Sequence, residues 1–386
     1  MSNTQVIRPS ELPEILAYSW AKDHPVLVMG PSGCGKSSII EQQARVRGQE
    51  LGYECFWKLG DPLPANPANT FAFIDFRLAS MDASDVKGFG SLDMDEGITR
   101  FLPPENMPRI DTHGAAGYLF ADEIDKADDG AVDSFTQLML TKVLGSYIFP
   151  KTWRIVSAAN RKQDGTGGGK VKSHVVGRGG TFEMEPNVAD FCSFDLSEGG
   201  SPAVHAFLRS VDGMIYSRDK SDVAYASARG WSMASEAVQS IDDPKLQRRI
   251  VAGYVGKAAS DALAGFQSLI ASGAEIASWA SIKADPMTAP IPSQSNSHRN
   301  ALAYAAIGII AAQVTKDSLT SEDMEVVLAY AGRLDSEHAT TLMHDLRVRD
   351  NAKLDPASKL YQADWHSLFD THAANRWIAD NPNASV

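Results

Sequence analysis

A glycine-rich segment that contains one lysine stands directly after an apolar run and before a helix-like stretch. Its residues are Gly30, Pro31, Ser32, Gly33, Cys34, Gly35, Lys36, Ser37 and Ser38. Glycines let backbone N–H groups turn inward around phosphate oxygens, and the start of the following helix adds a partial positive charge. We expect Lys36 to reach the β- and γ-phosphates of a nucleotide and the Ser37 hydroxyl to bind Mg²⁺. The segment is therefore predicted to be a P-loop that binds ATP with Mg²⁺.

Two adjacent carboxylates, Asp122 and Glu123, end the apolar run that starts at Gly117. We expect Asp122 to hold Mg²⁺ through water, and Glu123 to orient and polarise the water that attacks the γ-phosphate. Exposed acids at a strand end are common, but a P-loop earlier in the chain favours the functional interpretation. The pair predicts Mg-dependent hydrolysis of ATP to ADP and phosphate. Asp125 and Asp128 follow closely and are interpreted as solvated charges.

Three further polar residues are candidates for phosphate chemistry. Asn160 ends an apolar run that begins at Trp153. There its amide can reach between the γ-phosphate and the attacking water, although strand ends also favour asparagine in turns. Arg178 and Arg229 each stand beside glycine, and an arginine near a transferring phosphate stabilises negative charge. The residue types alone leave both arginines open as ordinary surface residues.

The elements that position these residues follow from the hydrophobic pattern. The first half of the chain alternates helix-like stretches with short apolar runs at 25–29, 70–76, 117–121, 153–158 and 181–185. This alternation is typical of an α/β fold with a parallel sheet covered on both faces, which we expect over residues 1–190.

From about residue 190 the composition changes to alanine, leucine, serine and charged residues with helical spacing. We predict an all-α segment over 191–285. Proline, serine and asparagine gather at 286–300, which indicates a linker. A small helical domain is expected over 301–386.

The overall composition limits the class of protein. Hydrophobic residues make up 44% of the 386 residues and charged residues 22%, which is ordinary for a folded globular chain. A net charge of −12 argues against a broad basic surface, so nucleic acid is not an expected partner. The three cysteines show no metal-ligand or disulfide spacing, and no run is long and apolar enough to span a membrane. We therefore expect a cytoplasmic protein without membrane contact.

Several strings together resemble the MoxR type of AAA+ ATPase. They are GPSGCGKSS from Gly30, FRLASMDASDVKG from Phe76, GYLFADEID from Gly117, LGSYIFP from Leu144, WRIVSAANR from Trp153 and FEMEP from Phe182. The resemblance runs nearly continuously from residue 10 to 275 and is weaker beyond. It implies an AAA+ core over 1–190, a helical lid over 191–285 with ATP between the two, and a helical C-terminal domain.

The resemblance also implies roles for the remaining polar residues. Asn160 takes the position of sensor 1, and Arg229 that of sensor 2. Arg178 falls where the family has an arginine finger that reaches the ATP of a neighbouring subunit. Two departures from the family pattern occur. Gly179 and Gly180 follow Arg178 where a large apolar residue is usual, which predicts a flexible segment, and alanine replaces the usual proline before Arg229.

The resemblance implies a working unit that is a ring, most often a hexamer. Hydrolysis in such a ring remodels, activates or matures a protein client, commonly with a partner that carries a von Willebrand factor A domain. Inserted hairpins are implied at 88–102 and 144–153. Tyr147 and Phe149 in the second hairpin either contact the client or form the hairpin core.

Two other classes of function stay open. A nucleic-acid-directed motor is favoured only by basic residues in the loop that contains Lys170, Lys172, His174 and Arg178. A scaffolding ring, in which bound nucleotide controls assembly, would need little turnover.

Overall fold

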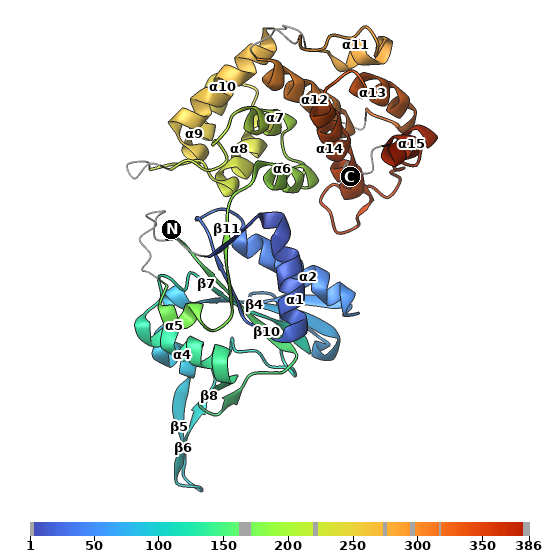
Figure 1. Ribbon diagram of the computed structural model, residues 1–386. Coiled ribbons are helices and arrows are strands. Elements are labelled where there is room, and N and C mark those ends of the chain that lie inside the picture. The colour runs from blue at the N-terminus through green and yellow to red at the C-terminus, as the bar shows by residue number, and fades with distance from the viewer. Residues whose placement is uncertain are drawn as a thin grey trace. The chain divides into compact units, whose positions relative to one another are not determined.

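Figure 1 shows the computed structural model, which describes residues 4–161, 171–218, 223–272, 276–293, 298–315 and 318–380. The contacts within the chain divide it into two compact units, Met1–Pro186 and Asn187–Val386, called unit 1 and unit 2. Unit 1 is built on a parallel sheet, and the described elements of unit 2 are helical. The predicted α/β fold followed by an all-α part is therefore confirmed.

The main sheet of unit 1 has the strand order β1-β11-β2-β10-β7-β4-β3, and all neighbouring strands are parallel. The strands are β1 (Gln5–Ile7), β2 (Val26–Met29), β3 (Cys55–Lys58), β4 (Thr70–Arg77), β7 (Ala116–Asp122), β10 (Trp153–Ala159) and β11 (Gly180–Met184). All strands predicted from the apolar runs are present. Only the edge strands β1 and β3 were not predicted, because each is short and has a single buried residue.

Helices cover both faces of this sheet. They are α1 (Leu12–Lys22), α2 (Lys36–Glu50), α3 (Ala83–Lys87), α4 (Asp129–Thr141) and α5 (Ser173–Val176). Side chains of the central strands alternate between the faces. Phe73 and Phe120 share a buried cluster with residues of α1 and α2, whereas Ile74 and Leu119 share one with residues of α4. The sheet is therefore buried on both sides, as expected for parallel strands.

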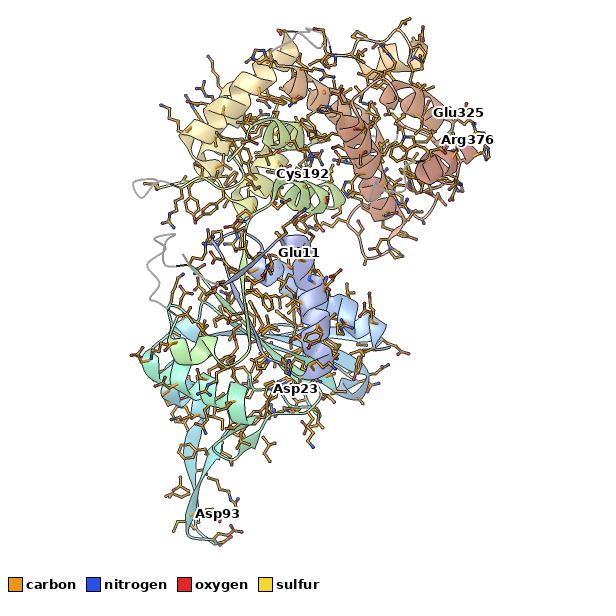
Figure 2. The ribbon with its side chains drawn as sticks, viewed as in Figure 1. Glu11, Asp23, Asp93, Cys192, Glu325 and Arg376 are labelled. Atoms are coloured by element: carbon orange, nitrogen blue, oxygen red, sulfur yellow. The ribbon has the colours of Figure 1, made fainter. Side chains whose placement is uncertain are left out.

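Two hairpins extend from unit 1 in the predicted places. One pairs β5 (Phe89–Asp93) with β6 (Ile98–Leu102), and the other pairs β8 (Val143–Leu144) with β9 (Tyr147–Ile148). The β5–β6 hairpin projects beyond the rest of unit 1 in Figure 1. Asp93, near its tip, is labelled in Figure 2.

The two hairpins differ in what they expose. The Tyr147 hydroxyl donates a hydrogen bond to the Pro108 carbonyl at 2.7 Å, and Phe149 is 3% exposed. Both aromatic residues therefore belong to the hairpin core, which is one of the two alternatives that the sequence left open. In the β5–β6 hairpin, by contrast, Leu92 is 73% exposed and Met94 is 82% exposed.

The helices of unit 2 share one extended hydrophobic core. They are α6 (Val188–Ser197), α7 (Pro202–Ser210), α8 (Ala228–Ser240), α9 (Pro244–Val255), α10 (Lys257–Ala271), α11 (Trp279–Ala284), α12 (Arg299–Thr315), α13 (Met324–Ala331), α14 (Ser336–Leu354) and α15 (His372–Asp380). Among the described residues, no helix combines the length and apolar character needed to cross a bilayer.

In unit 2, helices from both sides of the predicted linker at 286–300 pack against one another. α12, from the predicted C-terminal domain, packs against α7 from the predicted lid. The predicted linker also takes part in the packing, since the Tyr330 hydroxyl donates a hydrogen bond to the Pro290 carbonyl at 3.0 Å. Proline-rich composition indicated a break in regular structure, which is present. It did not indicate that the segment packs on the core.

Candidate functional site

The P-loop connects β2 to α2 at the carboxyl edge of the sheet, as its sequence predicted. Gly33 and Gly35 have φ values of 78° and 100°, a left-handed conformation that strains other residue types. α2 begins at Lys36, and no side chain caps its first turn. The free N–H groups of this turn and the helix dipole therefore favour an anion at the loop. Cys34 in the loop is buried, and burial raises the pKa of its thiol.

Lys36 is buried, and none of the described residues serves as its counter-ion. Its Nζ donates hydrogen bonds to the carbonyl oxygens of Gly30 and Pro31, each at 2.9 Å, and lies 3.4 Å from Asn160 Oδ1. It forms no ion pair with any residue that the structure describes. A buried ammonium group that has only neutral partners is costly, and an anionic ligand offsets that cost. This environment fits the phosphates of a nucleotide.

Ser37 and Asp122 come together although they are far apart in the sequence. Ser37 Oγ donates a hydrogen bond to Asp122 Oδ2 at 2.7 Å. The other carboxylate oxygen of Asp122 accepts a hydrogen bond from the Glu123 backbone N–H at 2.8 Å. A hydroxyl and a carboxylate side by side are hard oxygen ligands, and Mg²⁺ is typically held by one or two such side chains together with phosphate oxygens and water. The pair therefore fits the predicted magnesium position.

Glu123 stands in a tight turn directly after β7. Its φ of 53° is in the left-handed region, which is uncommon for glutamate and is found at positions that tertiary structure enforces. The carboxylate forms an ion pair with Lys126 and is partly exposed. Glu123 is therefore placed beside the magnesium position, and its carboxylate is accessible to water.

Asn160 and Asp125 form a buried polar pair next to Lys36. The backbone N–H of Asn160 donates a hydrogen bond to Asp125 Oδ1 at 2.9 Å, and its side-chain Nδ2 lies 3.5 Å from Asp125 Oδ2. Asp125 was predicted to be a solvated charge, but it is 7% exposed, so that prediction is wrong. Asp128, in contrast, is exposed and caps α4 by accepting a hydrogen bond from the Gly130 N–H.

A further carboxylate that the sequence analysis did not single out lies close to the magnesium position. Asp75 and Arg77 are on β4, and Arg77 is paired with Asp122 in the sheet register. Asp75 Oδ2 accepts a hydrogen bond from Arg77 Nε at 3.1 Å, while Oδ1 is buried without a partner among the described residues. Burial raises the pKa of Asp75 against the effect of Arg77, and the Asp122 charge raises it further.

Arg178 is exposed and forms no ion pair with the described part of the chain. The glycines after it have a packing role rather than the predicted flexibility. A Cβ on Gly179 would lie 2.1 Å from the carbonyl oxygen of Pro25, and the Gly180 N–H donates a hydrogen bond to that oxygen at 3.0 Å. Close approach of the backbone to the start of β2 requires Gly179. The segment that carries Arg178 is therefore fastened to the P-loop strand.

Arg229 belongs to unit 2 and stands in the first turn of α8. The helix is capped by Ser227, whose hydroxyl accepts a hydrogen bond from the Gly230 N–H at 3.2 Å. The Arg229 side chain is exposed. Its role as sensor 2 remains a prediction.

The basic loop that favoured a nucleic-acid motor is only partly described. Lys170 and the side chain of His174 lie outside the described part of the structure. Lys172 forms an ion pair with Asp129 at 2.8 Å and lies 3.8 Å from Asp133. Because acidic side chains of α4 neutralise Lys172, it offers little free positive charge to a nucleic-acid backbone.

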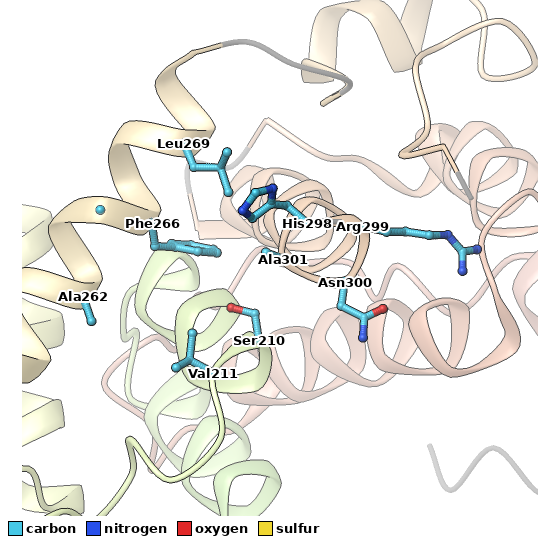
Figure 3. Close-up of a pocket in the computed structure, with 10 residues that line it drawn as sticks. Ser210, Val211, Ala262, Phe266, Leu269, His298, Arg299, Asn300 and Ala301 are labelled. Carbon is cyan, nitrogen blue, oxygen red and sulfur yellow. The ribbon is translucent and has the colours of Figure 1, made fainter. Parts of the chain in front are cut away.

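Unit 2 contains a separate cavity of about 660 Å³, shown in Figure 3. It is lined by the end of α7, by α10 and by the start of α12, with Ser210, Phe266 and His298 among its residues. No carboxylate is present among its described lining residues, and no predicted site residue lines it. We therefore place the candidate site at the P-loop.

A comparison with protein-family models gives no match, and a comparison with curated proteins gives none either. Solved structures that are similar to this chain include a Thermotoga maritima RuvB mutant, at 12% identity over 66% of this chain and 67% of that one, with a TM-score of 0.35. NtrX from Brucella abortus in complex with ADP is 12% identical over 98% and 68%, with a TM-score of 0.35. PCH-2 from C. elegans is 12% identical over 79% and 69%, with a TM-score of 0.29. At these low scores the likeness carries no argument, and the assignment of the site rests on topology and geometry.

Proposed function

We propose that this chain is an ATP-hydrolysing AAA+ ATPase of the MoxR type, which works as a hexameric ring and remodels or activates a protein client. The observation that carries the ATPase part is the buried Lys36, which has no counter-ion among the described residues, beside the Ser37–Asp122 pair at the end of β7. The positive charge of Lys36 can bind a nucleotide phosphate, and the neighbouring oxygen atoms of Ser37 and Asp122 can bind the metal ion that accompanies it.

Each residue of the site has one task in this mechanism. Lys36 and the N–H groups at the start of α2 bind the phosphates of ATP. Ser37 and Asp122 would hold Mg²⁺, which would neutralise charge on the phosphate oxygens. Glu123 orients the attacking water and accepts its proton. Asn160 contacts the γ-phosphate or the attacking water.

Two arginines complete the proposed mechanism. Arg178 reaches the ATP of a neighbouring subunit, where its charge stabilises the transition state. It is exposed and has no ion pair with the described residues, which leaves it available for that contact. Arg229 reports the state of the nucleotide from α8. The Gly180 N–H donates a hydrogen bond to the Pro25 carbonyl just before β2. A displacement of β2 would therefore also move the segment that carries Arg178.

The β5–β6 hairpin is the proposed contact with the client. Its apolar side chains Leu92 and Met94 are exposed, whereas Tyr147 and Phe149 in the second hairpin are buried. Exposed apolar side chains on a projecting element are typical of an interaction site. A partner with a von Willebrand factor A domain is part of the proposal through the family resemblance alone.

The test is a pull-down with the Glu123→Gln variant in the presence of ATP and Mg²⁺. Loss of the general base slows hydrolysis and should trap an ATP-bound ring with its client. The expected result is a retained protein that is released when ADP replaces ATP, and that is not retained when Leu92→Ser and Met94→Ser are added. If Glu123→Gln leaves activity in the cell and assembly intact, the chain is a nucleotide-controlled scaffold. If nucleic acid stimulates hydrolysis, a motor is favoured.

A further inference from the structure

The turn after β7 contains a buried carboxylate that is separate from the magnesium position. The turn is held by a hydrogen bond from the Lys126 N–H to the Glu123 carbonyl at 2.9 Å. A second hydrogen bond runs from the Ile124 N–H to the Ala158 carbonyl of β10 at 3.1 Å. Asp125 is buried in this turn and contacts Asn160 at the end of β10.

We infer that Asp125 is the positioning residue that fixes the side chain of Asn160 for ATP hydrolysis. The inference rests on the proposed function. Asp125 Oδ1 accepts a hydrogen bond from the Asn160 backbone N–H, and Asp125 Oδ2 faces the side-chain Nδ2 of Asn160. One carboxylate therefore holds both the backbone and the amide group of the same residue.

This arrangement selects one orientation of the Asn160 amide. An amide has a donor nitrogen and an acceptor oxygen of nearly the same shape, and only its partners decide which way it points. A carboxylate accepts hydrogen bonds and does not donate them, so the nitrogen faces Asp125. The Asn160 oxygen consequently faces Lys36, whose Nζ lies 3.4 Å away. Asp125 thus determines which atom of the Asn160 amide faces the phosphate site at the end of β10. Asp125 itself does not contact the phosphate.

A purely structural role for Asp125 makes a different prediction. A buried carboxylate that only tightens the turn would affect folding, and its loss would lower turnover regardless of what stands at position 160. A carboxylate that acts through Asn160 would matter only while Asn160 is present. A double-mutant cycle separates the two roles, because residues that act as a unit give non-additive effects.

The experiment measures steady-state ATP turnover of the full chain with Asp125→Asn, Asn160→Ala and the double variant. In Asp125→Asn, the amide oxygen of the new residue can still accept a hydrogen bond from the Asn160 backbone N–H. Its NH₂ group, however, is a donor that faces the donor Nδ2 of Asn160. We expect kcat to fall about ten- to a hundred-fold, as for other positioning groups, with KM for ATP changed less than about twofold. In the Asn160→Ala background, Asp125→Asn should lower kcat less than about twofold.

Asp128→Asn is the matched control, because it makes the same chemical change three residues away at an exposed cap, where asparagine serves as well as aspartate. Its turnover should equal that of the unsubstituted chain. If Asp125→Asn does not fold, the cycle uses Asp125→Glu, which keeps the charge and displaces the carboxylate by one methylene.

Two outcomes overturn the inference: normal kcat in the Asp125 variant, or equal losses from it in both backgrounds. Hydrolysis by the unsubstituted chain and its loss in Glu123→Gln test the proposed function separately. A negative result for Asp125 in an active chain therefore bears on the inference alone.

Discussion

Unit 1 has a group of buried polar side chains at one edge of its sheet, whereas unit 2 has one between packed helices. At the sheet edge, Lys36, Asn160 and Asp125 lie in contact where β7 and β10 end. In unit 2, Arg209 of α7 donates two hydrogen bonds to Asp345 of α14, at 2.6 and 2.7 Å. Both groups are charged and buried, but their surroundings differ.

The cations Lys36 and Arg209 differ in whether a side chain of opposite charge is bonded to them. Arg209 and Asp345 neutralise one another inside unit 2, so their cluster needs no ligand and serves the packing of the helices. Lys36 has only neutral partners among the described residues. Burial of charge alone therefore does not identify a functional site, and the proposal for the P-loop rests on the uncompensated charge together with the loop and the Ser37–Asp122 pair beside it.

The largest expected effect is on turnover and not on folding. Glu123→Gln should lower kcat for ATP by a factor of about 10² to 10⁴, the range that a general base contributes. Binding of ATP and the unfolding temperature should stay unchanged, because the carboxylate is partly exposed and its ion pair with Lys126 lies at the surface. Nucleotide binding, phosphate release and thermal unfolding are measured on the same sample. Glu50→Gln on the exposed face of α2 is the control, and normal turnover in Glu123→Gln would remove the assigned base.

The corresponding change in unit 2 should act on stability. Asp345→Ala leaves Arg209 buried without a counter-ion, which costs about 3–5 kcal/mol of unfolding free energy. Urea unfolding followed by a probe in unit 2 measures the loss. The control is Asp261→Ala, which breaks the more exposed Arg248–Asp261 pair and should cost at most about 1 kcal/mol. Equal costs for the two variants would contradict the comparison between buried and exposed pairs.

A smaller effect concerns the pH dependence of unit 2. Burial lowers the pKa of His205 below its ordinary value, against the effect of its hydrogen bond to Asp195. The unfolded chain then binds more protons than the folded one below the ordinary pKa near 6.5. Stability therefore falls as the pH drops through that value, by at most about 1.4 kcal/mol per pH unit for one group. His338 acts in the same direction, because burial lowers its pKa too.

Unfolding curves of unit 2 between pH 7.5 and pH 5.5 test this dependence. His205→Gln should reduce the loss of stability on acidification, whereas His366→Gln, at an exposed position, should leave it unchanged. A slope that is identical in the two variants would show that His205 does not contribute.

The smallest expected effect concerns the ion pair between Glu123 and Lys126. The pair holds the Glu123 carboxylate in the turn, and the carboxylate must leave Lys126 before it can accept a proton from water. Exposed pairs of this kind are weak, so Lys126→Met should raise kcat only about two- to fivefold. Lys126→Arg preserves the charge and should behave as the unsubstituted chain. A decrease of kcat in Lys126→Met would instead show that Lys126 supports the active position of Glu123.

Sequence patterns predicted the parts of the fold and the site that depend on local chemistry. The P-loop, the strands with long apolar runs and the carboxylate pair after β7 follow from residue type and spacing. The edge strands β1 and β3 were not predicted, because three or four residues with one buried side chain show no alternation of apolar and polar residues.

Contacts between distant segments could not be predicted in this way. Asp125 and Asp128 are the same residue type three positions apart, and only the approach of β10 decides which of them is buried. The residue types of Tyr147 and Phe149 suit a surface as well as a core, and the contact that decides is the hydrogen bond from the Tyr147 hydroxyl to the Pro108 carbonyl. In both cases the deciding partner is remote in the sequence.

The measurement that tests the central claim most directly is ATP binding and phosphate release by the full chain beside its Lys36→Ala variant, with Mg²⁺ present. The account predicts that the unsubstituted chain binds and hydrolyses ATP, and that Lys36→Ala loses both, because the buried ammonium group at the P-loop holds the phosphates. The unfolding temperature of the variant should be unchanged or higher, because the unpaired buried charge is gone. Its measurement shows whether the variant is folded. If a folded Lys36→Ala chain binds ATP as tightly as the unsubstituted one, the site at the sheet edge is not a nucleotide site.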